Sequence, residues 1–356
     1  MRILVAFLFL VLAAPAQLTK ATGDEFTVLV FHDIHMDTSP GYFHNAVDWL
    51  VGANGRGPGR VSGISYYNLK SINGVGDYAT TCGDQSWGVD PTPSAGTFLF
   101  DYERIAALSL PGIWTRGNHD NCSKYTDKFV TSLQSATFDV SGTAKGTIKL
   151  GIVGVGVADD LSAGQPSRLY VDGVISGSDA HRQWMFLRHV GPAAPYGDYT
   201  PRVTPPCGES AAQAAPNTPC TPWGLGALWQ DPSSGYSGVT SALALLNNFF
   251  YTVTRVFWFA TGHYSYGAAV VQVTANDGHL ISGIGNNGND GGNGHVTMFK
   301  FQPSLGHVQI AHYLIGDAAA PAGSVAGSVQ TTAWALQTTD EHGISSRPSP
   351  GRRRGR

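Results

Sequence analysis

Three clusters of polar residues each follow a short apolar run of the kind that forms a buried strand. In chain order the clusters are Asp33-Ile34-His35, Gly117-Asn118-His119-Asp120 and Gly262-His263. Ligand sites in layered α/β folds form in the loops beyond the carboxyl ends of strands. Carboxylates, an amide and imidazoles gathered in such loops suit divalent metals of borderline hardness, such as Zn, Mn or Fe. The spacing therefore predicts a metal site built from separate parts of the chain.

The order of the motifs resembles that of the calcineurin-like metallophosphoesterase superfamily, over about residues 26 to 315. The matching pieces are Asp33-x-His35, Gly83-Asp84, Gly117-Asn118-His119-Asp120 and Gly262-His263. The whole run is most similar to the acid phosphatase branch, which includes the purple acid phosphatases. The Gly-Asn-His-Asp motif is the most specific piece of the resemblance, and Asp-x-His is the least specific.

Two Gly-Asp pairs compete for the second motif of this family, Gly76-Asp77 and Gly83-Asp84. In the family, the aspartate that bridges two metals ends a short strand, and an Asp-aromatic pair lies seven residues earlier. Asp77-Tyr78 stands in that earlier place relative to Asp84. We therefore assign the bridging position to Asp84 and keep Asp77 as the alternative.

The resemblance implies two divalent or trivalent metal ions, Fe, Zn or Mn, that clamp a phosphate and activate a water molecule. The implied metal ligands are Asp33, His35 and the bridging Asp84 for the first ion, with Asn118 and His263 for the second. His119 would protonate the leaving oxygen and Asp120 would hold it in place. The purely structural alternative is that Asp120 caps a helix start and His119 packs against the sheet.

The sequence departs from the family pattern at two metal-ligand positions. The last motif reads Gly262-His263-Tyr264-Ser265, so serine stands where the family has a second histidine. The family's lone histidine is absent between residues 190 and 262, and His189 is the nearest candidate. We expect His189 on a solvated helix over Asp179–Val190. Trp87 occupies the place of the purple enzymes' metal-binding tyrosine, and indole has no lone pair to give, which argues against a tyrosinate–iron centre.

These observations favour a phosphoester hydrolase with two metals, similar to acid phosphatases and acting on a phosphorylated small molecule or protein. The two missing histidines predict weaker metal binding and impaired activity. One alternative is a degenerate family member that binds a ligand or partner without turnover. Another is a phosphodiesterase similar to the acid sphingomyelinase branch.

Helices and strands alternate early in the chain and strands dominate later, a pattern that predicts an α/β fold with layers around sheets. The expected strands are Thr27–Phe31, Ile113–Thr115, Thr147–Val157, Val253–Ala260, Ala268–Val273, His279–Ile284, Val296–Phe301 and Val308–Leu314. The expected helices are Phe98–Leu110, Asp179–Val190 and Val239–Phe250. The family resemblance implies, more specifically, a four-layer metallophosphoesterase-type β-sandwich flanked by helices.

The first sixteen residues have the three parts of a secretory signal peptide: a basic start at Arg2, an apolar run over Ile3–Leu12, and Ala14-Pro15-Ala16 as a cleavage site. The mature protein is then secreted or lumenal, in a lysosome-like compartment or elsewhere in the secretory pathway, with no membrane span. Four cysteines fit such an oxidising environment. Of the three possible connectivities we favour Cys82 with Cys122 and Cys207 with Cys220.

Composition supports one folded domain over residues 17–316, expected as a monomer. Hydrophobic residues make up 42% of the 356 residues, which excludes a wholly disordered chain. The net charge of −3 gives no support to nucleic-acid binding. Residues 317–356 are rich in small residues and end in an arginine run, so we expect a disordered, basic-ended tail.

Overall fold

A computed structural model describes most of the central part of the chain. The described residues are 18–32, 34–36, 40–52, 62–79, 81–117, 119–120, 122–156, 159, 161, 164–189, 255–261, 269–274, 280–285, 295–314 and 330–333. The predicted signal peptide, the Cys207–Cys220 pair and the helix over Val239–Phe250 lie outside them. No helix within these ranges is long and apolar enough to cross a membrane.

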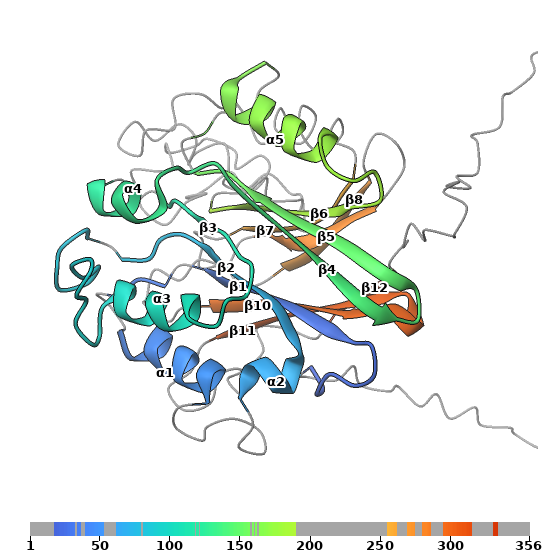
Figure 1. The fold of residues 1–356 in the computed structure, drawn as a ribbon, viewed down its shortest axis with the longest axis horizontal. Coiled ribbons are helices and arrows are strands. Elements are labelled where there is room, and N and C mark those ends of the chain that lie inside the picture. Colours follow the sequence, from blue (N-terminus) through green and yellow to red (C-terminus); the bar gives the residue numbers. More distant parts are fainter. Residues whose placement is uncertain are drawn as a thin grey trace, which may run out of the picture.

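Two mixed six-stranded sheets, counted over the described residues, pack face to face (Figure 1). The first has the order β12-β11-β10-β1-β2-β3, made of β1 (Phe26–His32), β2 (Leu69–Val75), β3 (Trp114–Thr115), β10 (His295–Gln302), β11 (His307–Leu314) and β12 (Gln330–Ala333). The second has the order β4-β5-β6-β7-β9-β8, made of β4 (Gln134–Thr143), β5 (Gly146–Gly154), β6 (Gln183–Arg188), β7 (Val256–Thr261), β8 (Ala269–Thr274) and β9 (Leu280–Gly285).

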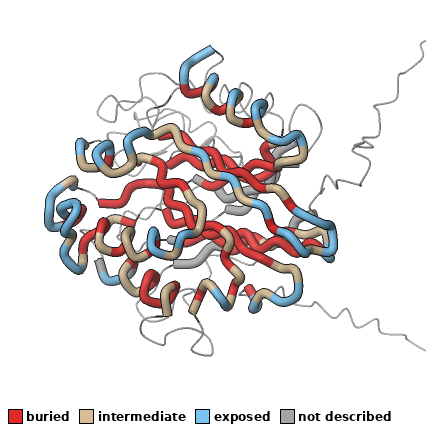
Figure 2. The backbone as a smooth tube through the Cα atoms, viewed as in Figure 1, coloured by how far each residue is buried: buried red, intermediate tan, exposed pale blue. Residues whose placement is uncertain are grey.

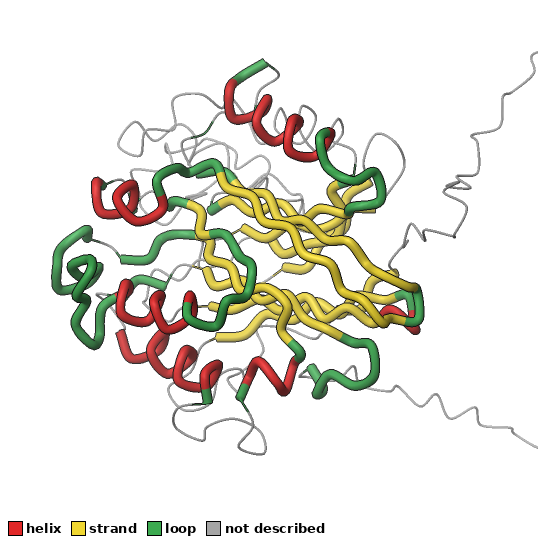
Figure 3. The backbone as a smooth tube through the Cα atoms, viewed as in Figure 1, coloured by secondary structure: helices red, strands yellow, loops and turns green. Residues whose placement is uncertain are grey.

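Helices lie on the outer sides of the two sheets (Figure 3). They are α1 (Pro40–Val51), α2 (Gly63–Tyr67), α3 (Phe98–Ala106), α4 (Ser123–Phe129) and α5 (Pro166–Ser176), with a short 3₁₀ turn over Pro303–Leu305. The first three lie on the side of the first sheet, and α5 lies on the side of the second. The expected α/β class, with a β-sandwich flanked by helices, is confirmed.

Strand β1 shows how the sequence builds these layers. Every residue of β1 is buried (Figure 2), because one face packs against the second sheet and the other against the helices. Val28 and Val30 belong to the core between the sheets, whereas Leu29 and Phe31 belong to the core beneath the helices. The sequence of a strand that is buried on both faces is a continuous apolar run, in which polar and apolar residues do not alternate.

The prediction of a helix over Asp179–Val190 is wrong. The apolar residues in the middle of this segment form β6, a buried strand that pairs in parallel with β5 and β7. The residues before it form a turn, in which the backbone N–H of Arg182 donates to the carbonyl of Asp179 at 3.0 Å. A short apolar run that is buried on both faces has no periodicity to tell a strand from a helix.

The tail beyond residue 316 also differs from the prediction in one segment. Residues 330–333, expected to be disordered, form β12 and pair antiparallel with β11. This short segment carries Thr331 and Thr332, and β-branched residues favour strands. An edge strand offers unpaired backbone groups that such a segment can satisfy.

Parallel pairing brings the carboxyl ends of several strands to one edge of the sandwich. In the first sheet β1 pairs with β2 and β2 with β3, all in parallel, with His32 opposite Val75 and Val75 opposite Thr115. In the second sheet β6 runs parallel to β7, with Arg188 opposite Thr261. The loops after these strands therefore begin close together, and they carry the polar motifs of the sequence.

Candidate functional site

Asp77 lies at the centre of the site, two residues after the end of β2. Its side chain has no exposed surface, and its Oδ1 accepts a hydrogen bond of 2.8 Å from the backbone N–H of His119. Its backbone carbonyl accepts a bond of 3.1 Å from the N–H of His35. The Asp77 loop is thus tied to the loop after β3 and to the loop after β1.

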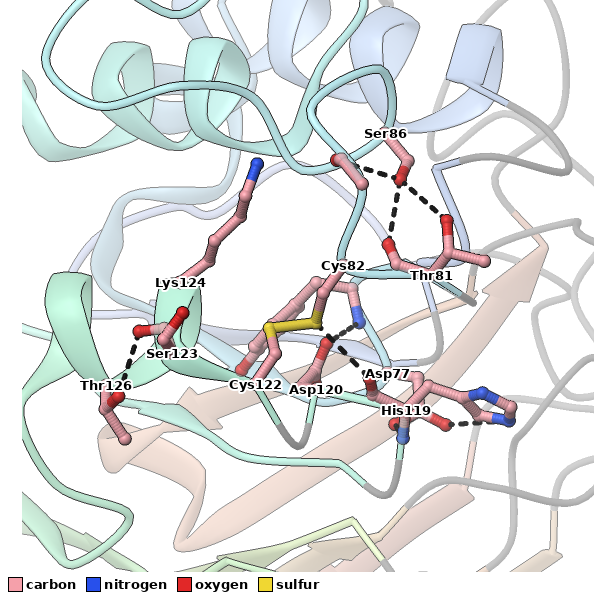
Figure 4. Close-up of a disulfide and its surroundings, with 12 residues drawn as sticks. Asp77, Thr81, Cys82, Ser86, His119, Asp120, Cys122, Ser123, Lys124 and Thr126 are labelled. Carbon is pink, nitrogen blue, oxygen red and sulfur yellow. Dashed lines mark hydrogen bonds and ion pairs between the residues drawn. A yellow bond between two sulfur atoms is a disulfide. The ribbon is translucent and has the colours of Figure 1, made fainter.

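Imidazole rings from three different loops surround Asp77. The Nε2 of His189 lies 3.3 Å from its Oδ2, and the Nε2 of His119 lies 3.9 Å from the same oxygen (Figure 4 draws Asp77 and His119). The rings of His35 and His119 are 5.7 Å apart, centre to centre. His189 is fully buried, whereas the side chain of His119 is 39% exposed. Histidines that are distant in the sequence therefore surround one buried carboxylate.

Two buried carboxylates with opposite pKa shifts share this region. Burial alone would raise the pKa of Asp77, but the facing imidazoles, His189 first and His119 next, hold it below its usual value. Burial and the negative charge of Asp77 raise the pKa of Asp120 well above its usual value. Like charges this close disfavour double ionisation, so the pair retains its negative charge on Asp77.

Asp120 joins the loops that carry the two motifs. Its Oδ1 accepts a bond of 3.0 Å from the backbone N–H of Tyr78, and its Oδ2 accepts one of 3.0 Å from the N–H of Gly117. The first belongs to the Asp77 loop and the second to the turn of Asp120 itself. These bonds fix the segment that carries His119 against the Asp77 loop.

Two glycines make the close approach of these loops possible. A Cβ at Gly117 would lie 1.9 Å from the Oδ1 of Asp77, and a Cβ at Gly76 would lie 2.1 Å from the backbone nitrogen of Gly117. Both distances are far below van der Waals contact. The glycine of Gly76-Asp77 and the glycine of the Gly-Asn-His-Asp motif are therefore required by packing.

A disulfide between Cys82 and Cys122 fastens the same two loops, as Figure 4 shows. Cys82 lies five residues after Asp77, and Cys122 lies two residues after Asp120. The predicted pairing of these two cysteines is confirmed.

Asp84, which the sequence analysis placed at the bridging position, lies away from the histidines. Its side chain is 71% exposed, and its Oδ1 forms an ion pair with the ammonium of Lys124. The structure brings Asp77, the alternative, to the histidines instead. Asp84 lies in a surface turn, whereas Asp77 lies two residues after the end of the parallel strand β2.

Trp87 lies in the hydrophobic core. Its side chain is fully buried, and its ring packs 5.8 Å from Tyr78 and 5.0 Å from Phe98. It belongs to the aromatic core beneath the Asp77 loop, where it supports that loop from below.

Other predicted ligands, Asp33, Asn118 and His263, and the departure at Ser265 lie outside the described residues. Within the part of the chain that the structure describes, no group of three or more His, Cys, Asp or Glu side chains converges as a metal site. The donor types around Asp77 nevertheless suit a divalent or trivalent metal, since a carboxylate faces imidazoles in a buried setting.

His189 is the residue that sequence reasoning discarded. It directly follows the buried strand β6, as the other motifs follow their strands, so the signal that found those motifs applied to it as well. Assigning β6 to a helix hid this signal.

Comparison with known proteins gives distant matches only. No family model matches the chain, and no curated protein matches its sequence. Among solved structures the chain matches a purple acid phosphatase isolated from yellow lupin (Lupinus luteus) seeds, with 10% identity and a TM-score of 0.44. That match covers 88% of this chain and 55% of the lupin chain, so this chain spans about half the length of the lupin protein.

A second solved structure is GAP50, described as the anchor in the inner membrane complex of Plasmodium. It has 10% identity and a TM-score of 0.44, and the match covers 87% of this chain and 88% of that one.

Proposed function

We propose that this chain is a metal-dependent phosphoester hydrolase of the acid phosphatase kind that works in the secretory pathway or outside the cell. The observation that carries the proposal is the buried carboxylate of Asp77, which faces His189 at 3.3 Å and His119 at 3.9 Å. These groups lie just beyond the carboxyl ends of parallel strands, where ligand sites form in α/β folds. Buried carboxylates among imidazoles are suited to binding metal ions.

The contacts around Asp77 support a different set of metal ligands from the one that the sequence pattern suggests. Asp77 would be the bridging ligand that the family resemblance implies, and His189 would stand for the lone histidine. The remaining ligands are those of the sequence pattern, Asp33, His35, Asn118 and His263. Two bound cations would supply positive charge that stabilises the phosphoryl group in transfer.

His119 is suited to a different task, the protonation of the leaving oxygen. Its backbone N–H is fixed on Asp77, while its side chain is 39% exposed and open to a substrate. Histidine side chains commonly act as general acids in enzymes. The contacts of Asp120 with Tyr78 and Gly117 hold the turn on which His119 stands.

The Cys82–Cys122 disulfide supports the proposed compartment, because disulfides persist in secreted and lumenal proteins and are rare in the cytosol.

The test combines metal content with hydrolysis of two phosphomonoesters that differ in the acidity of their leaving group. Protein loaded with Zn, Mn or Fe should hydrolyse both phenyl phosphate and 4-nitrophenyl phosphate. His119→Ala should slow the phenyl ester by about 10²-fold or more and the nitrophenyl ester less, with metal content unchanged. His181→Ala, which changes a histidine at the opposite end of β6, is the matched control and should leave both rates unchanged. Equal losses on both esters would remove His119 from the acid role.

A second candidate function is ligand binding without turnover. The serine at position 265, where the family has a histidine, favours it. Protein that binds phosphate tightly yet hydrolyses neither ester at saturating metal would support this second function and contradict the first.

A further inference from the structure

Arg188 is a fully buried arginine directly beside the candidate site. It is the last residue of β6, and His189 follows it in the chain. Its Nη2 donates to the backbone carbonyl of Asp159 at 2.7 Å, and its Nε donates to the carbonyl of Gly156 at 3.4 Å. A buried charge is costly unless hydrogen bonds compensate it. Arg188 therefore ties the end of β6 to the loop that follows β5.

The loop that Arg188 holds is itself closed by two hydrogen bonds. The backbone N–H of Asp159 donates to the carbonyl of Gly156 at 3.2 Å. The N–H of Gly156 donates to the Oδ2 of Asp159 at 2.6 Å. The two carbonyls that Arg188 contacts thus belong to one short turn with a fixed backbone.

Strand geometry places Arg188 and His189 on opposite sides of the second sheet. Met185 and Leu187 belong to the core between the sheets. Because successive side chains of a strand point to opposite faces, Arg188 points to the outer face and His189 toward the first sheet. The 3.3 Å contact of His189 Nε2 with the Oδ2 of Asp77 agrees with this direction. Arg188 can therefore act on the backbone of His189 from outside the site.

The backbone pairing between β5 and β6 ends just before His189. The last paired residues are Gly154 and Leu187, and the N–H of Val155 then donates to the carbonyl of Leu187 at 3.2 Å. Beyond this point the side chain of Arg188 continues the connection to the β5 side. A displacement of the strand end by about 1 Å would lengthen the contact of His189 with the buried carboxylate beyond hydrogen-bond distance.

We propose that Arg188 is a positioning residue of the metal site, because its guanidinium fixes the end of β6 so that His189 faces Asp77. The proposal rests on the function proposed above and adds a residue that lies outside the proposed set of ligands. Groups that orient metal ligands without binding the metal commonly contribute 10- to 100-fold to metal affinity.

The test reads the imidazole of His189 directly, in metal-free protein with ¹⁵N-labelled histidine. The ring resonance of His189 is assigned by its absence from His189→Gln. Arg188→Gln should shift this resonance, because the ring loses its fixed place beside Asp77. Calorimetric titration with Zn²⁺ should then show binding weakened by about tenfold or more. A resonance and a Zn²⁺ affinity that both stay as in the natural protein would overturn the proposal.

Arg182→Gln is the matched control at the other end of the same strand. Arg182 lies just before β6, about 20 Å from Arg188 along the strand. Its Nη1 donates to the backbone carbonyls of Leu150 at 2.6 Å and Phe138 at 3.2 Å. Its loss should lower the thermal unfolding midpoint, as Arg188→Gln does, but leave the His189 resonance in place and the Zn²⁺ affinity within about twofold. Equal effects of the two variants on the site would overturn the positioning role, because general loss of stability would then explain both.

Two milder variants cover the case in which Arg188→Gln does not fold. Arg188→Lys keeps the charge but loses the forked group that reaches two carbonyls, so it should shift the His189 resonance less. Asp159→Ala loosens the same loop from its other side, because it removes the acceptor for the N–H of Gly156. It should also shift the resonance. A resonance unchanged in both variants would overturn the proposal.

Failure of the underlying function gives a different result. If the natural protein binds no Zn²⁺ and hydrolyses neither phenyl phosphate nor 4-nitrophenyl phosphate, the proposed function fails. The resonance in metal-free protein still decides the role of Arg188. A shift in Arg188→Gln that is absent from Arg182→Gln would keep the positioning role, and no shift in either would discard it.

Discussion

Two Gly-Asp pairs lie seven residues apart in this chain and have opposite surroundings. Asp77 has no exposed surface and faces histidines from two other loops, whereas the side chain of Asp84 is 71% exposed and pairs with Lys124. The difference arises from position in the fold, because Asp77 directly follows a buried parallel strand. The strand that precedes a Gly-Asp pair thus decides whether its aspartate is buried among other loops or exposed.

The glycines of the two pairs differ in the same way. A Cβ at Gly76 would lie 2.1 Å from the backbone of Gly117, but a Cβ at Gly83 would find its nearest atom, the Oγ1 of Thr81, at 3.6 Å. The first glycine is required by a close approach of loops, and the second is replaceable. Packing around the glycine therefore separates the two pairs as sharply as the environment of the aspartate does.

The largest expected effect concerns the disulfide that joins the Asp77 loop to the Gly-Asn-His-Asp loop. Replacing Cys82 and Cys122 together by alanine should lower the free energy of unfolding by about 4 kcal/mol, since the bond closes a loop across a sequence separation of 40. Denaturant unfolding in guanidinium measures the change. A loss below about 1 kcal/mol would mean that the two loops stay together without the bond.

The glycine comparison gives the next effect. Gly117→Ala should cost about 3 kcal/mol in unfolding free energy, because its Cβ would lie 1.9 Å from Asp77 and force the loops apart. Gly83→Ala is the matched control and should change stability by less than about 0.5 kcal/mol. Thermal unfolding of both variants checks this, and equal effects would erase the distinction between the two pairs.

A third, smaller effect uses a half-buried, paired carboxylate, Glu25, as a reference. Glu25 accepts from the buried Lys300 at 2.9 Å and from Gln302 at 2.6 Å. Burial opposes its ionisation, but these partners hold the pKa of Glu25 below its usual value. The stability that its charge provides is therefore present above the pKa of the unfolded chain and is lost as pH falls through the lower folded value.

Glu25→Gln should accordingly cost about 2 kcal/mol at pH 7, and the cost should shrink as pH falls below about 4. Urea unfolding of both proteins at a series of pH values measures it. A cost independent of pH would assign the effect to packing and remove Glu25 as a reference for a paired carboxylate.

Much of the fold could be predicted from local pattern. The apolar run of β1 and the later strands β7 to β11 follow from hydrophobic residues between turn signals. Strand β2 could not be recognised so simply, because its sequence LKSINGV is polar in places. Its buried Asn73 is satisfied by the carbonyl of Leu29 at 3.1 Å and by the N–H of Ile113, partners that only the assembled sheet provides.

Part of the candidate site could also be predicted from local pattern, and part of it could not. His35, His119 and Asp120 follow strands that the sequence reveals, and the structure brings their loops to Asp77. Asp77 was held only in reserve because the family's Asp-aromatic offset favoured Asp84, and strand β2, which would have drawn attention to Asp77, was not recognised. His189 was discarded because β6 has the same apolar character on both faces and was assigned to a helix.

The most direct test of the central claim, that Asp77 and not Asp84 is the centre of the site, is calorimetric titration of metal-free protein with Zn²⁺ or Mn²⁺. Asp77→Asn should weaken binding by at least about 100-fold, because it removes the buried charge among the histidines. Asp84→Asn should stay within about threefold of the natural protein, because that carboxylate is 71% exposed and paired with Lys124. Metal binding that is lost in Asp84→Asn and kept in Asp77→Asn would contradict the account.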